Sequence, residues 1–500
     1  MIRPTRMTAG PRRGRGHEAG AKVNLADNRL SGSVAVFRGT AENESDNMVA
    51  AGRDIVDPTG INGKFSGRTR LPSNWWALRH PSIMNRRDFL ASTFLGALAA
   101  SLHAAGRKRP ARVVLRSSWQ TVNIGDIGHT PGVLALIEQH LPEIEVTLWP
   151  MDVRNGVEEM LRARFPRLRI VRTKEEAYQC DFLLHGSGPY LTAHRDVAAW
   201  RKDTGKPYGV YGITMAAAGD PGLKIMRNNG LDEPTRVLLN GASFVFLRDG
   251  VSLDVVKRAG VTSPIIEFGP DGAFAADVRN DAAAIAFLRE HGLEEGKFLC
   301  AIPNLRNAPY WRIKPTYPFD EAKHRRNEAM KEHDHAPLRE AMVAIMRQTP
   351  MKFLVCPEDS TQMETGKELL VDPLPADVKA KVVWREKFWL TDEAISTYVR
   401  SAGLLSCEMH SPIMCVGNGV PALVCRFVEQ TTKGFMWRDI GLGDWLFDLD
   451  QPEELARIVP TALALARDPA AAKAKAAKAR EFVHQRQRAT MQILQKAATA

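Results

Sequence analysis

RVVLRSSWQTVNIGDIGHTPGVLALIEQH, residues 112–140, contains a strand-like run, a glycine-rich loop and an amphipathic stretch, in that order. The run RVVLRSS holds consecutive apolar residues, two of them β-branched, which is typical of a buried strand. Apolar residues at helical spacing follow from Pro131 to His140, and proline is favoured in the first turn of a helix. The stretch therefore predicts a strand, a loop over residues 121–132 and a helix.

The same alternation repeats along the rest of the chain. A second series begins after Pro270 and a predicted helix from Asp281 to His291, and this pattern favours mostly parallel sheets covered on both faces. We predict an α/β protein with two Rossmann-like domains facing across a cleft, at residues 112–280 and 281–500, the second ending in a long helix. The strand-like runs are EVTLWP, LRIVR, DFLLHG, YGVYGI and SFVFLRD in the first series, and KFLCAIP, MKFLVCPED, KVVWRE, GLLSCEM and PALVCRF in the second.

The stretch NRRDFLASTFLGALAASLHAAG, which follows Met84, has the parts of a secretory signal. Arg86 and Arg87 form its basic part, an apolar run follows, and small residues up to Ala105 offer a cleavage site. The run is too short to span a bilayer, which needs about 20 apolar residues. We interpret residues 84–106 as a twin-arginine signal peptide, with translation starting at Met84, and residues 1–83 as a mispredicted or disordered extension. The alternative is a buried apolar helix.

The charge of the chain is concentrated near its N-terminus. The chain has 68 Lys and Arg against 57 Asp and Glu, a net charge of +11, but residues 113–500 carry equal numbers of each sign. The predicted domains also lack a basic stripe, which excludes nucleic acid as a partner. The six cysteines show no CxxC spacing and so imply no metal site, although in an exported protein they are able to pair.

Glycine-rich loops follow two of the predicted strands. In TVNIGDIGHTPG, Asn123, Gly125 and Asp126 precede a helix, and in LLHGSGPYL, Gly186 and Gly188 follow a buried strand. Doubly wound sheets bind ligands beyond the carboxyl ends of their strands, where glycine lets the backbone approach a ligand and a helix N-terminus attracts anions. These glycines are therefore candidate ligand contacts, with a purely structural turn as the alternative.

Charged residues follow two further strands. In FLRDGVSLDVVKRAG, Arg248 leaves a strand, and its guanidinium is suited to hold a carboxylate or phosphate; the alternative is an ion pair with Asp249 or Asp254. In LLSCEMHSPIMCVGNGVPALVCRF, His410 begins a helix after a strand, which suits a proton donor or anion ligand. A histidine with a structural role is the alternative there.

Each of these four loops carries one motif of a set. The motifs are Asn-x-Gly-Asp after the first strand, a glycine-rich end on a later strand, Arg-Asp-x-x-Ser, and Ser-x-x-x-His followed by Gly-x-Pro. Together they resemble the polysaccharide pyruvyl transferases, over about residues 113–446 and most specifically over residues 406–421. The resemblance implies an architecture similar to two-domain glycosyltransferases of the B type. It also implies transfer of the enolpyruvyl unit of phosphoenolpyruvate to sugar hydroxyls, with a pyruvate ketal formed and phosphate released.

The resemblance assigns roles to individual residues. Arg248 would neutralise the anionic groups of the donor, His410 would contact the phosphate or act as an acid, and Asp126 would act as a base or sugar contact. Two residues before the histidine the family commonly has arginine, whereas this chain has Glu408, whose charge would repel a phosphate. The implied substrate-binding residues are Asn123, Gly125, Gly186, Gly188, Ser406, Glu408 and Lys433.

We therefore predict an exported polysaccharide pyruvyl transferase-like protein in the periplasm or cell envelope. Its partners would be a polysaccharide or glycan acceptor, a small anionic donor and the export machinery, with phosphoenolpyruvate as candidate donor and no cofactor. The alternative is a non-catalytic exported carbohydrate-binding protein of the same fold. We expect no metal site, because the histidine-rich stretch His324, His333, Asp334 and His335 matches no known ligand spacing.

Two aromatic-rich stretches leave alternatives open. Residues 304–338 mix aromatic, basic and histidine side chains and form either an acceptor-binding loop or a surface insertion. Trp437 and Trp445 are able to stack on a sugar face, although burial is the alternative for both.

Overall fold

The structure, a computed structural model, describes residues 16–25, 30–39, 109–215 and 231–500. It divides into two compact units, residues 1–106 and 107–500. In the first unit β1 (Gly16–Leu25) and β2 (Leu30–Gly39) pair as antiparallel strands, where the sequence predicts no regular structure. The predicted signal peptide, residues 84–106, lies outside the described residues.

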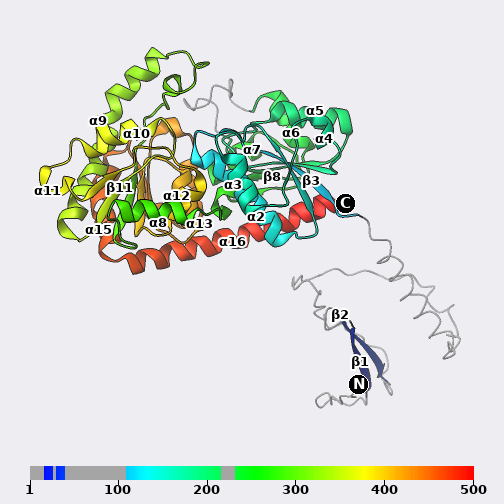
Figure 1. The fold of residues 1–500 in the computed structure, drawn as a ribbon. Helices are drawn as coiled ribbons and strands as arrows, with labels where there is room; N and C mark the ends of the chain where they lie inside the picture. The colour runs from blue at the N-terminus through cyan, green and yellow to red at the C-terminus, as the bar shows by residue number, and fades with distance from the viewer. Residues whose placement is uncertain (1–15, 26–29, 40–108, 216–230) are drawn as a thin grey trace, which may run out of the picture. The chain divides into compact units, whose positions relative to one another are not determined.

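A parallel sheet forms the first half of the second unit (Figure 1). Its strand order is β5-β4-β3-β6-β7-β8-β9, the doubly wound order in which the direction of winding reverses between β3 and β6. Three of its strands are buried along their whole length, which explains their near-continuous apolar sequences. The strands are β3 (Arg112–Ser117), β4 (Glu145–Pro150), β5 (Arg169–Ile170), β6 (Phe182–His185), β7 (Tyr208–Ile213), β8 (Val245–Leu247) and β9 (Ile266–Phe268).

A second parallel sheet repeats this winding. Its order is β12-β11-β10-β13-β14-β15, and the reversal falls between β10 and β13. The predicted α/β class with two Rossmann-like domains is therefore confirmed. The strands are β10 (Phe298–Ile302), β11 (Lys352–Val355), β12 (Val382–Trp384), β13 (Gly403–Ser406), β14 (Ala422–Arg426) and β15 (Leu446–Asp448).

The sequence patterns miss the last strand of each sheet. Both β9 and β15 are short edge strands, so their apolar residues are too few to show a strand period. The first sheet ends at Phe268 and the second begins at Phe298, on either side of the predicted domain boundary at residue 280.

Helices connect the strands and pack on the sheets. They are α2 (Ile124–His140), α3 (Val157–Arg164), α4 (Lys174–Ala177), α5 (His194–Thr204), α6 (Glu233–Gly241), α7 (Gly250–Arg258), α8 (Asp281–Glu290), α9 (Glu321–Gln348), α10 (Gln362–Gly366), α11 (Ala376–Lys379), α12 (Thr391–Tyr398), α13 (His410–Gly417), α14 (Met436–Asp439), α15 (Pro452–Arg467) and α16 (Pro469–Thr499). In the described part of the chain, no helix combines the length and apolarity that a membrane crossing requires.

Helix α2 begins earlier than its sequence indicates. It starts at Ile124 rather than near Pro131, so the predicted loop over residues 121–132 is wrong for most of its length. Tertiary packing explains the difference, because a side chain at Gly128 would meet Met414 Sδ at 2.9 Å and one at Gly132 would meet the Gly272 carbonyl at 1.9 Å. The glycines weaken the intrinsic helical preference but allow this close packing.

The two domains share one continuous apolar core. A single cluster of buried side chains includes Leu115 of the first sheet, Phe298 of the second, and Phe274 and Met414 between them. Helix α16, drawn in red in Figure 1, packs against both α2 and α13. Apolar contact of this extent favours a fixed arrangement of the two domains.

Candidate active site

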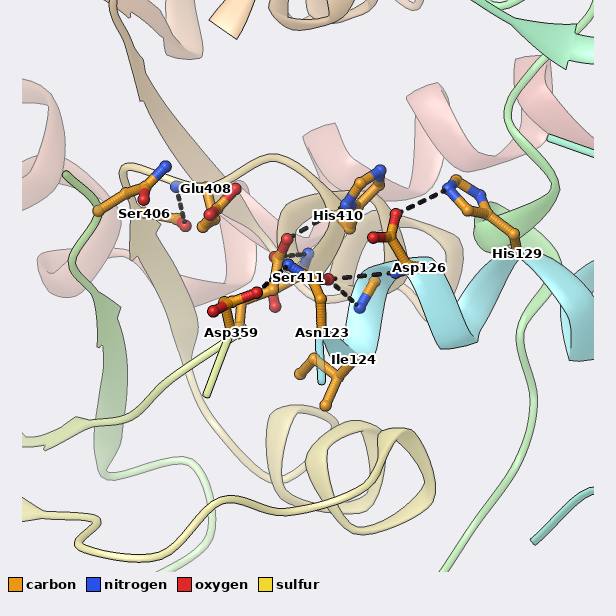
Figure 2. Close-up of polar contacts among 12 residues, drawn as sticks. Asn123, Ile124, Asp126, His129, Asp359, Ser406, Glu408, His410 and Ser411 are labelled. Carbon is orange, nitrogen blue, oxygen red and sulfur yellow. Dashed lines mark hydrogen bonds and ion pairs between the residues drawn. The ribbon is translucent and has the colours of Figure 1, made fainter. Parts of the chain in front are cut away.

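The N-terminus of α2 brings the first domain into the site. Asn123 caps the helix, because its Oδ1 accepts hydrogen bonds from the backbone N–H groups of Gly125 and Asp126 at 2.8 and 3.1 Å. Gly125 packs directly beneath His410, and a side chain there would lie 2.1 Å from His410 Cβ. The absence of a side chain at Gly125 therefore lets Asp126 and His410 approach from different domains (Figure 2).

Backbone hydrogen bonds fix this helix end to the second domain. The N–H of Ile124 donates to the carbonyl of Glu358 at 2.9 Å, and the N–H of Ser360 donates to the carbonyl of Val122 at 2.8 Å. The hydroxyl of Thr391 donates to the carbonyl of Ile124 at 2.7 Å. The loop after β11 therefore sets the position of the helix that carries Asp126.

His410 is held by a buried carboxyl group. Its Nδ1 lies 3.2 Å from Oε1 of Glu358, whose Oε2 accepts a hydrogen bond from the N–H of Ser411 at 2.6 Å. Burial lowers the pKa of His410 well below its ordinary value, and the positive charge of Lys433 lowers it further. The imidazole is therefore neutral near pH 7, and its Nε2 has no hydrogen-bond partner among the described residues.

A second buried histidine lies beside the first. His129 and His410 make an edge-on ring contact with centroids 4.8 Å apart. His129 Nδ1 lies 2.8 Å from Oδ1 of Asp271, and Asp271 Oδ2 accepts from Arg248 Nη1 at 2.5 Å. Burial opposes ionisation of Asp271, but His129 and Arg248 outweigh it and lower the pKa of this carboxyl group. His129, Asp271 and Arg248 therefore form a buried row in which each side chain contacts the next.

This row changes the interpretation of Arg248. The predicted donor clamp is only 1% exposed, and its Nε donates to Thr214 Oγ1 at 2.7 Å while its Nη1 pairs with Asp271. Its charge still acts on His410, whose pKa it lowers. Arg248 therefore supports Asp271 and His129 within the protein, which is different from the open position that the sequence indicates for a donor clamp.

Asp126 faces the two histidines. Its Oδ1 lies 3.8 Å from His129 Nε2, and its Oδ2 accepts a hydrogen bond from Gln120. Burial acts to raise the pKa of Asp126, but His410, His129, the Gln120 hydrogen bond and Lys433 together lower it. Asp126 is therefore a carboxylate at neutral pH.

Glu408 is a buried acid rather than an exposed negative charge. Its Oε1 accepts a hydrogen bond from Gln362 Nε2 at 2.8 Å, and its backbone N–H donates to Ser406 Oγ at 2.9 Å. Burial raises the pKa of Glu408 well above its ordinary value, and the charge of Glu358 adds to this effect. These effects favour the protonated form of Glu408, so it would repel a phosphate less than its sequence position suggests.

Lys433 is a cation whose charge reaches these carboxyl groups. It is half-buried, and its side chain makes no hydrogen bond or ion pair with any described residue. Its charge acts on Asp126, Glu358, Glu408 and His410, whose pKa values it lowers. Lys433 is therefore better placed than Arg248 to meet an anionic ligand.

The two glycines after β6 pack against protein side chains. A side chain at Gly186 would lie 2.8 Å from Ser117 Oγ, and one at Gly188 would lie 2.9 Å from Trp119 Nε1. Ser187, between them, accepts a hydrogen bond from the N–H of Gly272 at 2.8 Å. This loop supports the segment that carries Asp271, and its glycines allow close packing there.

The aromatic loop after β10, which contains Tyr310 and Lys314, contacts the site at Gln120. Tyr310 donates from its hydroxyl to Asp359 Oδ2 at 3.0 Å, and Lys314 Nζ donates to Gln120 Oε1 at 2.8 Å. Gln120 in turn bonds Asp126, so the loop is connected to the site through one side chain. Trp437 and Trp445 are buried instead, so neither is available to stack on a sugar.

Several functional candidates escape the sequence patterns. Glu358 and Asp359 lie in the loop after β11, and loops after strands are the position that identifies the other site residues, while Asp271 carries no motif. The predicted site residues Asn123, Gly125, Asp126, Ser406, Glu408, His410 and Lys433 come together, whereas Arg248, Gly186 and Gly188 act through protein contacts. All six cysteines are free and buried, and His335 and Asp334 bond the Lys331 carbonyl and Arg306 respectively.

Comparison with known proteins identifies one family. A family model described as polysaccharide pyruvyl transferase matches residues 123–426. No relative among curated proteins matches the chain. Similar solved structures include UDP-GlcNAc 2-epimerase from Neisseria meningitidis bound to UDP-GlcNAc, 11% identical, covering 77% of this chain and 100% of that chain with a TM-score of 0.46.

Two others are Anabaena HepE in complex with UDP-glucose and S. aureus MnaA with UDP. The first is 10% identical, with 78% of this chain and 100% of that chain covered and a TM-score of 0.47. The second is 11% identical, with 73% and 90% covered and a TM-score of 0.46. At these identities and TM-scores the likenesses carry no argument about ligand or reaction.

Proposed function

This chain belongs to the polysaccharide pyruvyl transferase family, and we propose that it transfers a pyruvyl or related group from a phosphorylated donor to sugar hydroxyls of a polysaccharide. One observation carries the proposal. An acid with a raised pKa lies in one site with a cation and a histidine nitrogen that have no partner among the described residues, although Asp126, Glu408, His410 and Lys433 come from three segments of the chain.

The reaction requires one proton to enter the donor and two to leave the acceptor. With phosphoenolpyruvate as donor, protonation of the vinyl carbon makes the neighbouring carbon electrophilic, and a first sugar hydroxyl attacks it. Phosphate then leaves as a second hydroxyl attacks, which closes the ketal. One hydroxyl proton is balanced by the new methyl group and the other by the departing phosphate, so the protein must both give and recover a proton.

Glu408 is suited to give and recover that proton. Burial raises its pKa, and the negative charges of Glu358 and Asp359 favour the protonated form further. After donating to the vinyl carbon, its carboxylate is able to accept the proton of the sugar hydroxyl. Glutamate in place of the family's common arginine therefore supplies an acid at this point of the site.

Lys433 and His410 are suited to the anionic end of the donor. Within residues 109–215 and 231–500, the Lys433 ammonium group has no ion-pair partner and His410 Nε2 has no hydrogen-bond partner. A phosphate or carboxylate beside Lys433 would gain charge-assisted hydrogen bonds from its ammonium group. The acceptor would then approach from the side of Tyr310 and Gln120, where the aromatic loop meets the first domain.

Phosphate release from phosphoenolpyruvate, in the presence of mixed surface polysaccharides, tests this function. The full chain is compared with His410→Ala and with His324→Ala, which alters an exposed histidine of α9 as a matched control. We expect release that requires acceptor and is lost only in His410→Ala. Sugar binding without any phosphate release would instead favour the non-catalytic carbohydrate-binding protein.

Export is a separate part of the proposal. The basic pair Arg86-Arg87 and the apolar run after it support a twin-arginine signal, and they lie outside the described residues. Replacing both arginines by lysine should keep the protein in the cytoplasm if this signal directs export. Cell fractionation of the two forms measures the effect, and an unchanged distribution would contradict it.

A further inference from the structure

Three side chains from the two domains converge on one point of the site. Asp126, His129 and His410 each offer a ligand atom within 4.8 Å of the other two. Asp126 Oδ1 and His129 Nε2 are 3.8 Å apart, and neither makes the short contact of a hydrogen bond to the other. The cluster therefore has ligand atoms that are close together but not bonded to one another.

Both histidines leave the same nitrogen without a partner. Nε2 of His129 and Nε2 of His410 are buried and make no hydrogen bond to any described residue. The His129 side chain is fully buried, and that of His410 is 6% exposed. Because buried polar atoms are nearly always bonded, two such atoms at adjacent positions indicate a missing partner that both would bind.

The opposite nitrogens are oriented by carboxyl groups. His129 Nδ1 lies 2.8 Å from Asp271, and His410 Nδ1 lies 3.2 Å from Glu358. With the proton on Nδ1 and directed at the carboxyl oxygen, the lone pair lies on Nε2, which is the usual arrangement behind a histidine that binds metal. The two carboxyl groups therefore hold each imidazole in the direction that a cation at Nε2 requires.

Local charge also favours a cation over an anion at this point. The charge of Arg248 is matched by Asp271 through their 2.5 Å contact. Asp126 adds a carboxylate at the point itself, and the carboxyl group of Glu358 stands behind His410. Lys433 is the one remaining cation whose charge is felt by these groups in the described part of the chain.

We propose that Asp126, His129 and His410 bind one divalent transition-metal ion through one carboxylate oxygen and two imidazole Nε2 atoms. Two imidazoles and a carboxylate suit zinc or ferrous iron. Bonds of about 2.0–2.2 Å to the ion bring ligand atoms roughly 3.0–3.5 Å apart, so the three atoms must close on the ion by about an ångström. This site lies outside the histidine-rich stretch of α9 and differs from the expectation of no metal.

The use of the ion in the reaction rests on the proposed function, whereas its binding does not. Three protein ligands leave coordination positions open, and an oxygen of the donor's phosphate or carboxylate would fill one of them. The donor would then meet His410 through the ion. An anionic donor would thereby be held in a site whose own side chains are largely acidic.

Metal titration of the full chain, stripped with chelator, tests the binding without donor or acceptor. Zn²⁺ is added in a calorimeter, and Co²⁺ is added in a spectrophotometer, where visible absorption reports its coordination. We expect one equivalent to bind, with affinity reduced about 100-fold or more in Asp126→Asn and His129→Gln. His324→Ala should bind as the unaltered chain does, and thermal unfolding of each variant checks that it is folded.

Each outcome of the metal titration supports or rejects the proposed metal site. Failure of the unaltered, folded chain to bind Zn²⁺ and Co²⁺ would overturn it, and so would equal binding by folded Asp126→Asn. Should His129→Gln fail to fold, Asp126→Asn still decides, because its side chain keeps the same shape and is partly exposed. Binding without phosphate release would leave the metal site standing and reject the proposed function, while full turnover in chelated protein would reject the ion's role in it.

Discussion

The two domains each contribute a buried histidine backed by a carboxyl group, but the two carboxyl groups are in opposite states. Asp271, behind His129, has a lowered pKa, because His129 and Arg248 outweigh its burial. Glu358, behind His410, has a raised pKa, because burial exceeds the effect of Lys433 and the Ser411 hydrogen bonds. The first domain therefore supplies a fixed charge, and the second supplies groups that exchange protons.

The difference between the two carboxyl groups indicates which residues take part in the reaction and which residues support the structure. The pair of Arg248 and Asp271 has no reason to change its protonation during a reaction, since each neutralises the other. Glu358 and Glu408 interact with each other and contact no Lys or Arg in the part of the chain that the structure describes, so protons move among them at lower cost. We therefore expect changes in the first domain to affect stability, and changes in the second to affect turnover.

Arg248→Ala should give the largest loss of stability, about 3–5 kcal/mol, because it leaves Asp271 buried without its cation. Urea unfolding measures the change. Arg154→Ala is the matched control, since that ion pair with Asp152 is on the surface and its loss should leave the urea midpoint almost unchanged. An Arg248→Ala protein that keeps its stability but loses turnover would show that Arg248 holds the donor, as its sequence position suggests.

Glu408→Gln should leave the fold intact and reduce phosphate release by about 10²–10⁴-fold, because an amide cannot donate the proton. The change keeps the side chain's shape and its ability to accept from Gln362 Nε2. Phosphate release at a saturating donor concentration measures the loss of turnover. Glu386→Gln, which alters an exposed glutamate, is the control. Turnover within a few-fold of the unaltered protein would place the acid elsewhere.

The same residue predicts a dependence of stability on pH. Because the pKa of Glu408 is raised above its ordinary value of 4.5, the folded state holds its proton at pH values where the unfolded state has lost it. Stability from this group is therefore fully present below pH 4.5 and falls as pH rises through the folded pKa. The slope reaches about 1.4 kcal/mol per pH unit.

Urea unfolding of the unaltered protein and of Glu408→Gln at several pH values between 5 and 8 measures this effect. The difference in unfolding free energy should move in favour of Glu408→Gln as pH rises. A difference that stays constant with pH would contradict the protonated state of Glu408.

Gly125→Ala should have the smallest effect, about 1–3 kcal/mol in stability with a partial loss of turnover. The added methyl group would overlap the His410 side chain, so either the histidine or the helix end must shift. Unfolding and phosphate release are both measured, with Gly443→Ala as control, where the added atom meets only ordinary contacts of 3.4 Å or more. Unchanged stability and turnover in Gly125→Ala would show that the two domains are less tightly packed at this point.

The sequence by itself determined the winding of both sheets and the loops that carry the site. Strand runs such as RVVLRSS are buried on both faces, and their apolar pattern is local, so they could be recognised without tertiary information. In a parallel sheet the carboxyl ends of the strands lie at one edge, which is why Asp126 and His410 could be selected from their positions. Glu408 is noticed only through the family resemblance.

Tertiary structure alone decided the state and partners of these groups. The sequence places Arg248 at a strand end, but only the fold brings Asp271 against it and leaves its charge neutralised. It marks Glu408 as a repulsive charge, but burial beside Glu358 raises its pKa and favours the protonated form. Protonation and pairing depend on the solvent exposure and neighbours of each group, and residues far apart in the chain set both.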